Sequence, residues 1–135
     1  MNADELETAN ATHEHINQVR VFLGMVIVEL LHRGEIHDRS KFSEIELKKF
    51  TEILPMLRGS TYGSEEYKKS LQQLGPALNH HYHMNRHHPE FFKNGIRDMN
   101  LIDLIEMYVD WLASTMRHAN GSILNSIEMN RKRFD

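Results

Sequence analysis

Cysteine is absent from this sequence of 135 residues, and its absence limits the chemistry of the protein. Without cysteine the chain forms no disulfide and offers no thiolate to a metal ion. A metal site in this protein therefore has to use histidine nitrogens and carboxylate oxygens. The chain has ten histidines and 19 acidic residues to supply such groups.

Long apolar runs and a strong net charge are also absent. The longest apolar run, residues 21–31, is interrupted by Gly24 and Glu29 and is too short to span a membrane. The formal net charge is −3, and the basic residues are scattered except at residues 131–133, which argues against nucleic acid as the main partner. No signal peptide is visible at the acidic N-terminus. We therefore expect a cytoplasmic protein with no membrane partner.

The spacing of apolar residues predicts an all-α fold. A chain of this length is expected to form a single domain over residues 1–135, with residues 1–10 either frayed or part of a first helical turn. Apolar residues recur at steps of three and four, and capping residues and breakers divide the chain into helices. The predicted helices cover about residues 12–34, 43–54, 64–74, 76–89, 100–118 and 122–134. We expect a compact bundle of about five to six helices and no strand.

Half of the histidines lie in one stretch, residues 77–92. On a helix they would form two neighbouring rows, His80-His83-His87 and His81-His88. Imidazole is the commonest protein ligand for transition metals, and crowding so many imidazoles is unfavourable once they become protonated. A metal site gives this crowding a reason, whereas the alternative is a solvated histidine-rich helix face. Spacing does not decide between the rows, and we favour His81 and His88 as ligands.

Two further candidate ligands precede this stretch. His15 lies beside the apolar stripe of the first predicted helix, where a lone histidine is usually a hydrogen-bonded residue at the edge of the core. His37 and Asp38 are adjacent, and adjacent residues on a helix point in different directions. The pair can reach one ion only if the backbone turns around that ion.

An acidic row follows the histidines. Asp103, Glu106 and Asp110 share one helix face, which is usually a sign of a solvated surface. Asp110, however, lies between Val109 and Trp111 in the most apolar part of this helix. It is therefore the carboxylate that we expect to be buried and to be paired or bound to a metal.

These candidates, taken in order, resemble the motif of the HD-domain metal-dependent phosphohydrolase superfamily. The motif consists of a histidine, a His-Asp pair and a distant aspartate, which converge in an all-helical bundle. The resemblance matches His15 to the first histidine, His37 and Asp38 to the pair, and Asp110 to the last aspartate. The pair continues to Lys41, similar to the His-Asp-x-x-Lys form of many members. The implied fold is HD-domain-like.

The chain departs from the HD pattern in its short spacing between His15 and His37. His13 competes for the first position, and Asp103 competes with Asp110 for the last. The sequence also looks closely like an uncharacterised family of small bacterial and phage proteins. Four stretches carry that resemblance, residues 37–42, 80–90, 103–111 and 126–134.

The resemblance implies a metal-dependent phosphohydrolase that acts on a nucleotide or a related phosphorylated metabolite. One or two divalent ions would supply the activated water, and nitrogen and oxygen ligands suit Mn, Fe, Co, Ni, Zn or Mg. Asp38 would bridge ions or orient water, and Lys41 and Arg86 would neutralise phosphate charge. The alternative functions are a metal- or nucleotide-binding regulator of bacterial or phage origin without turnover, and a structural helical protein. A homodimer is compatible with the short chain.

Overall fold

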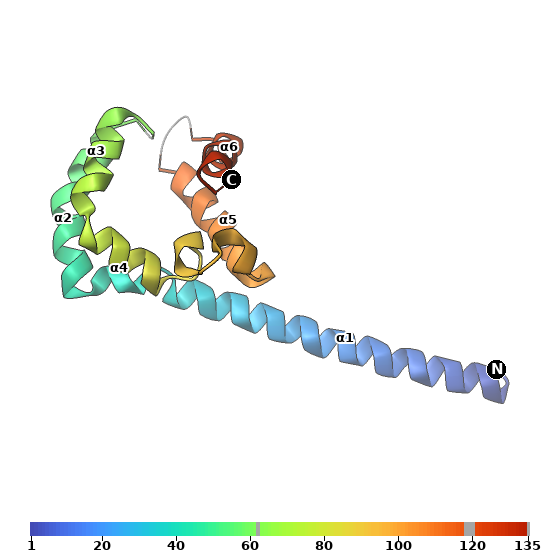
Figure 1. The fold of residues 1–135 in the computed structure, drawn as a ribbon. Helices are drawn as coiled ribbons and strands as arrows, with labels where there is room; N and C mark the ends of the chain where they lie inside the picture. Colours follow the sequence, from blue (N-terminus) through green and yellow to red (C-terminus); the bar gives the residue numbers. More distant parts are fainter. Residues whose placement is uncertain (62, 118–120, 135) are drawn as a thin grey trace. The chain divides into compact units, whose positions relative to one another are not determined.

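The computed structural model describes residues 1–61, 63–117 and 121–134, and all regular structure within them is helical. This part of the chain has six α-helices and three short 3-10 helices and contains no strand, so the predicted all-α fold is confirmed (Figure 1). In order they are α1 (Ala3–Ile36), η1 (Arg39–Phe42), α2 (Glu44–Gly59), α3 (Glu65–Leu74), α4 (Pro76–Met84), η2 (Pro89–Phe91), η3 (Gly95–Asp98), α5 (Leu101–Thr115) and α6 (Ile123–Phe134).

The chain divides into two compact units, Met1–Glu35 and Ile36–Asp135. The first consists of almost all of α1, and the second contains the other helices. A single domain over residues 1–135 stays a prediction. None of the described helices is both long and apolar enough to cross a membrane.

Helix α1 begins at Ala3, well before the predicted start at Thr12. The reason is a reciprocal cap that the sequence analysis did not use. The Glu5 backbone N–H donates to Asn2 Oδ1 at 2.8 Å, and the Asn2 backbone N–H donates to Glu5 Oε2 at 2.7 Å. Such a capping box satisfies two backbone donors and fixes the first turn. Residues 3–10 are therefore helical.

Capping residues also start the helices of the second unit. Ser43 and Ser64 accept hydrogen bonds from backbone N–H groups three residues later, at the starts of α2 and α3. Asn100 and Asp103 form a capping box at the start of α5. These starts agree with the predicted ones. The predicted end of α5 at His118 lies outside the described residues.

Helix α2 continues past its predicted end at Leu54. Pro55 lies inside the helix, where it removes one backbone hydrogen bond. The last turn nevertheless remains helical, and α2 packs against both α3 and α4. Tertiary packing of this kind routinely overrides local propensity.

The apolar core of the second unit is small. Its buried apolar residues are Ile53, Leu74, Ala77, Met99 and Met107. Leu74 is completely buried at the end of α3, where Gly75, with a positive φ of 45°, turns the chain into α4. Pro76 then occupies the first turn of α4, a position that needs no backbone N–H donor. The break between α3 and α4 places the histidine-bearing helix against α2.

Candidate metal centre

Histidine and carboxylate side chains of the second unit converge in three overlapping groups. Within each group the potential ligand atoms all lie within 4.8 Å of one another. The groups are Asp38-His81-His87-His88, His37-His87-Glu106 and His37-Asp38-Asp110. The cluster therefore has the composition and spacing needed to hold a metal ion.

A left-handed turn allows His37 and Asp38 to face the same centre. Asp38 precedes η1 with φ 57° and ψ 12°, and it is the one non-glycine residue with a positive φ in the described part of the chain. Aspartate tolerates this conformation better than most residues. The turn leaves His37 Nε2 3.5 Å from Asp38 Oδ2, while Asp38 Oδ1 lies 3.2 Å from His81 Nε2. The two carboxylate oxygens thus face different histidines.

His81 is held on α4 by a fully buried carboxylate. Its Nδ1 donates to Glu46 Oε2 at 2.9 Å. Its other ring nitrogen, Nε2, therefore faces Asp38, and it lies 3.0 Å from His88 Nε2. The two ring nitrogens of His81 therefore have defined directions, with Nδ1 toward α2 and Nε2 toward the centre of the cluster.

His87 is the most deeply buried histidine of the cluster, with 1% of its surface exposed. Its Nε2 lies 3.5 Å from Asp38 Oδ1, and its Nδ1 lies 3.1 Å from Glu106 Oε1. Among the described residues neither ring nitrogen has a partner in hydrogen-bond geometry, and the same is true of Asp38 Oδ1. Buried polar atoms without partners are costly. A metal ion between His87 Nε2 and Asp38 Oδ1 would satisfy these two atoms, so the residues fit such an ion.

Helix α5 supplies two carboxylates one turn apart. Glu106 Oε1 accepts a hydrogen bond from His37 Nδ1 at 3.0 Å, and Asp110 Oδ1 lies 3.5 Å from His37 Nε2. His37 is therefore enclosed by acidic groups on both ring nitrogens. Both α5 side chains are partly buried, whereas Asp103 is completely buried, so the expectation that Asp110 would be the buried carboxylate of the row is wrong.

The charges of the cluster shift the pKa values of three groups. Asp110 and Glu106 raise the pKa of His37 to about 10. Burial raises the pKa of the Asp38 carboxyl, but neighbouring groups, among them the Lys41 ammonium that donates to it, outweigh burial and hold the pKa well below its usual range. Burial lowers the pKa of His88 to about 2, with a further contribution from the neighbouring His87 and His81. Asp38 is thus an anion and His88 a neutral imidazole, as metal ligands must be.

The two cations predicted to contact phosphate are both engaged with carboxylates. The Lys41 ammonium donates to Asp38 Oδ2 and lies over the Phe50 ring. Arg86 makes two hydrogen bonds to Asp103, from Nε at 3.0 Å and from Nη2 at 2.9 Å. Asp103, the alternative to Asp110 in the sequence analysis, is thereby tied to Arg86. A catalytic role of Lys41 and of Arg86 stays a prediction.

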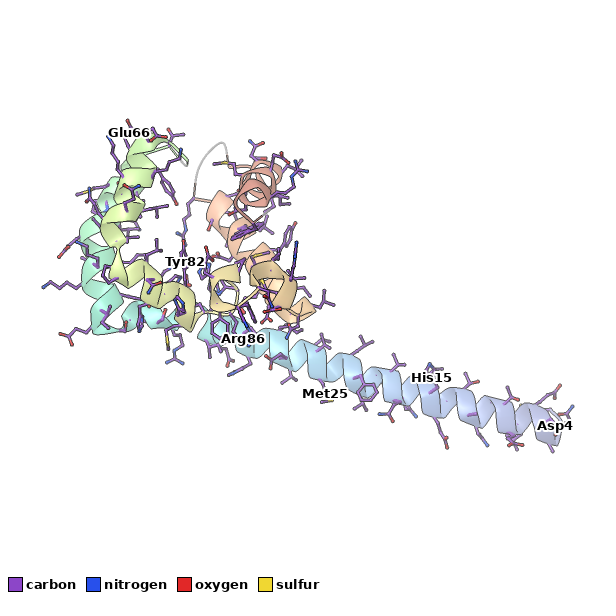
Figure 2. The ribbon with its side chains drawn as sticks, viewed as in Figure 1. Asp4, His15, Met25, Glu66, Tyr82 and Arg86 are labelled. Atoms are coloured by element: carbon purple, nitrogen blue, oxygen red, sulfur yellow. The ribbon has the colours of Figure 1, made fainter. Side chains whose placement is uncertain are left out.

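The structure brings together five of the six predicted ligands, namely His37, Asp38, His81, His88 and Asp110. The sixth, His15, lies on α1 in the other unit with an exposed side chain (Figure 2), and its role as a ligand stays a prediction.

The preferred ligand set of the sequence analysis omitted His87 and Glu106. The sequence predicted a helix that continued to Pro89, and this prediction wrongly placed His87 in one helical row with His80 and His83. Helix α4 ends at Met84, so His87 follows a turn and does not share a row with His80 and His83. An extended Asn85 at the end of α4 is the local reason. Glu106 was visible in the acidic row, and its spacing of four residues from Asp110 was the available signal.

Comparison with other proteins gives a family without an assigned activity. No curated protein and no solved structure matches the chain. The resemblance to HD-domain enzymes therefore stays a prediction. One family profile matches residues 4–135, which is nearly the whole sequence. The chain belongs to the family of unknown function DUF5662.

Proposed function

We propose that this protein binds divalent metal ions in the cluster and uses them to hydrolyse a small phosphorylated substrate such as a nucleotide. One observation carries the metal part of the proposal. His87 and Asp38 hold buried nitrogen and oxygen atoms without hydrogen-bond partners in the described part of the chain, directed at a centre lined by further ligands. A cation at that centre is the simplest way to satisfy them.

The two oxygens of Asp38 support a site for two ions. Oδ1 faces His81 and His87, and Oδ2 faces His37. A first ion would be held by Asp38, His81, His87 and His88. A second would be held by His37, Asp38 and Asp110, with Glu106 beside it. Asp38 would then bridge the pair.

The ligand types support a transition metal more than magnesium. Four imidazoles and three carboxylates converge here, and imidazole suits Mn, Fe, Co, Ni and Zn, whereas Mg prefers oxygen ligands alone. A divalent ion in such a site lowers the pKa of a water molecule and polarises a phosphoryl oxygen. The hydrolytic part of the proposal rests on this chemistry and on the resemblance to the HD motif.

The protein's own groups have defined roles in this proposal. Asp38 keeps its negative charge because its pKa is low, so it remains a ligand at neutral pH. The Lys41 ammonium donates to Asp38 Oδ2 and so contacts the cluster directly. When a phosphate group enters the site, the Lys41 ammonium is placed to exchange part of its contact with Asp38 for a contact with a phosphoryl oxygen.

Phosphate release is the test of hydrolysis. Purified protein is incubated with a panel of nucleotides and sugar phosphates, with and without added Mn2+, Co2+ or Zn2+. Asp38→Ala removes the bridging carboxylate, and Asp4→Ala, an exposed residue of α1, serves as the matched control. We expect metal-dependent release by the wild type and by Asp4→Ala only. Equal release by Asp38→Ala would attribute the activity to another site or to a contaminant.

A second candidate function is the binding of a metal ion or a nucleotide without turnover. It is favoured because both cations predicted to contact phosphate are paired with carboxylates. Lys41 is paired with Asp38, and Arg86 is paired with Asp103, so each would have to give up a carboxylate to bind phosphate. A regulator of this kind would bind metal tightly and release no phosphate from any member of the panel. The same assay therefore separates the two functions.

A further inference from the structure

Glu46 is a fully buried carboxylate outside the three groups of potential ligands. It lies in the first turn of α2, where its backbone N–H donates to the capping Ser43. Its side chain points away from the cap and toward α4. Oε1 accepts a hydrogen bond from His80 Nδ1 at 2.6 Å, and Oε2 accepts one from His81 Nδ1 at 2.9 Å.

The surrounding donors determine which nitrogen of His81 carries a proton. Asn85 Nδ2 donates to Ser40 Oγ and to the His81 carbonyl oxygen, both at 2.7 Å, and lies farther, at 3.1 Å, from His81 Nδ1. Ser40 in turn donates its single hydroxyl hydrogen to Glu46 Oε2 at 3.1 Å. His81 Nδ1 lies 3.1 Å from both Ser40 Oγ and Asn85 Nδ2, but its shortest contact is the one of 2.9 Å to Glu46 Oε2. A carboxylate oxygen only accepts hydrogen bonds, so this contact requires a proton on His81 Nδ1.

A proton on Nδ1 leaves Nε2 as the free ligand atom of neutral His81. This atom lies 3.2 Å from Asp38 Oδ1 and 3.0 Å from His88 Nε2, two further potential ligand atoms. Histidine ligands commonly donate their other ring N–H to a carboxylate, which fixes both the tautomer and the ring orientation.

We propose that Glu46 is a positioning residue that sets the tautomer of His81 and directs Nε2 into the metal centre. The proposal deepens the proposed metal site and rests on it. His80 shares the same carboxylate through Oε1 and so fixes its orientation from the neighbouring position on α4. His80 and His81 thus donate to the same carboxylate, and of these two only His81 belongs to a group of potential metal ligands.

Glu46→Gln keeps the shape of the side chain but replaces one acceptor oxygen with an NH2 donor. Two imidazole N–H groups then compete for one oxygen, so one imidazole must lose its bond or move its proton to Nε2. A protonated Nε2 cannot bind a metal ion. We expect affinity for Co2+ to fall about 10- to 100-fold, the usual cost of removing such a partner. Glu44→Gln, on the exposed side of the same helical turn, is the matched control.

Two measurements test the proposal. Long-range 1H–15N correlation spectra of metal-free protein in mildly alkaline buffer report which ring nitrogen of His81 carries the proton. Titration with Co2+, followed by its visible absorption bands, reports affinity and ligand geometry. The expected result is an Nδ1 proton on His81 in the wild type and in Glu44→Gln, with weakened Co2+ binding in Glu46→Gln alone.

An Nε2 proton on wild-type His81 would overturn the proposal without any variant, so misfolding of Glu46→Gln does not remove the test. Wild-type affinity for Co2+ in a folded Glu46→Gln would also overturn it. If wild-type protein carries the Nδ1 proton but binds no Co2+, the proposed metal function fails, while the assignment of the His81 tautomer to Glu46 stands.

Discussion

Replacing Arg86 with methionine is expected to destabilise the fold. Arg86 connects the turn that carries His87 to the start of α5 through two hydrogen bonds to Asp103, whose side chain is 0% exposed. Methionine keeps an unbranched apolar side chain but removes both bonds and the guanidinium charge that lies over the Phe91 and Phe92 rings.

The magnitude follows from the burial of the two partners. A hydrogen bond to a charged group contributes about 1.5–3 kcal/mol, but the Arg86 side chain is 41% exposed, so water replaces part of the interaction. We therefore expect a loss of about 2–3 kcal/mol in the free energy of unfolding, near the lower end for two such bonds. For a chain of this size that corresponds to a fall of about 10 °C in Tm.

Thermal melts followed by circular dichroism, in buffer with EDTA, measure this loss without a contribution from bound metal. Arg97→Met, an exposed arginine of η3, is the control and should melt close to the wild type. A Tm of Arg86→Met within about 2 °C of the wild type would refute the reasoning. If such a variant also lost phosphate release, Arg86 would instead be the phosphate contact predicted from the sequence.

Four further outcomes are expected. The pKa of His37 in the metal-free protein is raised to about 10. The proton on His37 therefore stabilises the metal-free fold at low and neutral pH, and this stabilisation is lost as the pH rises toward 10. Metal binding must displace this proton, so affinity should weaken as pH falls, and calorimetry in buffers of different ionisation enthalpy should show proton release. Asp110→Asn should lower the pKa of His37 toward its ordinary range, measured by NMR titration, since Asp110 raises it most; an unchanged pKa would contradict this geometry. Leu74→Ala should lower the free energy of unfolding by about 2–5 kcal/mol in urea, because Leu74 is fully buried.

Helix positions were largely predictable from local signals. The starts of α2, α3 and α5 are marked by capping residues that bond to a backbone N–H only three residues away, namely Ser43, Ser64 and Asn100. Boundaries that depend on contacts between distant residues were not predictable in this way. Pro55 predicts an end to α2, but the helix continues through it.

The candidate site was predictable in its residue types and less so in its arrangement. His37 and Asp38 were recognisable as a pair, but the left-handed turn at Asp38 that makes them converge has no clear sequence signal. Periodicity placed His87 on a helix that in fact ends at Met84. The contribution of Glu46 depends on α2 packing against α4, a contact between residues far apart in sequence, so no local pattern indicated it.

Metal content of the untagged protein is the most direct test of the central claim. Elemental mass spectrometry is applied to wild-type protein and to Asp38→Ala, purified side by side and then exposed to Mn2+, Co2+ or Zn2+ before removal of free ions. We predict about two ions per wild-type chain, as in bridged two-metal sites, and a clearly lower metal content in Asp38→Ala. A wild-type protein that retains no metal, and whose Tm does not rise when any of these ions is added, would contradict it.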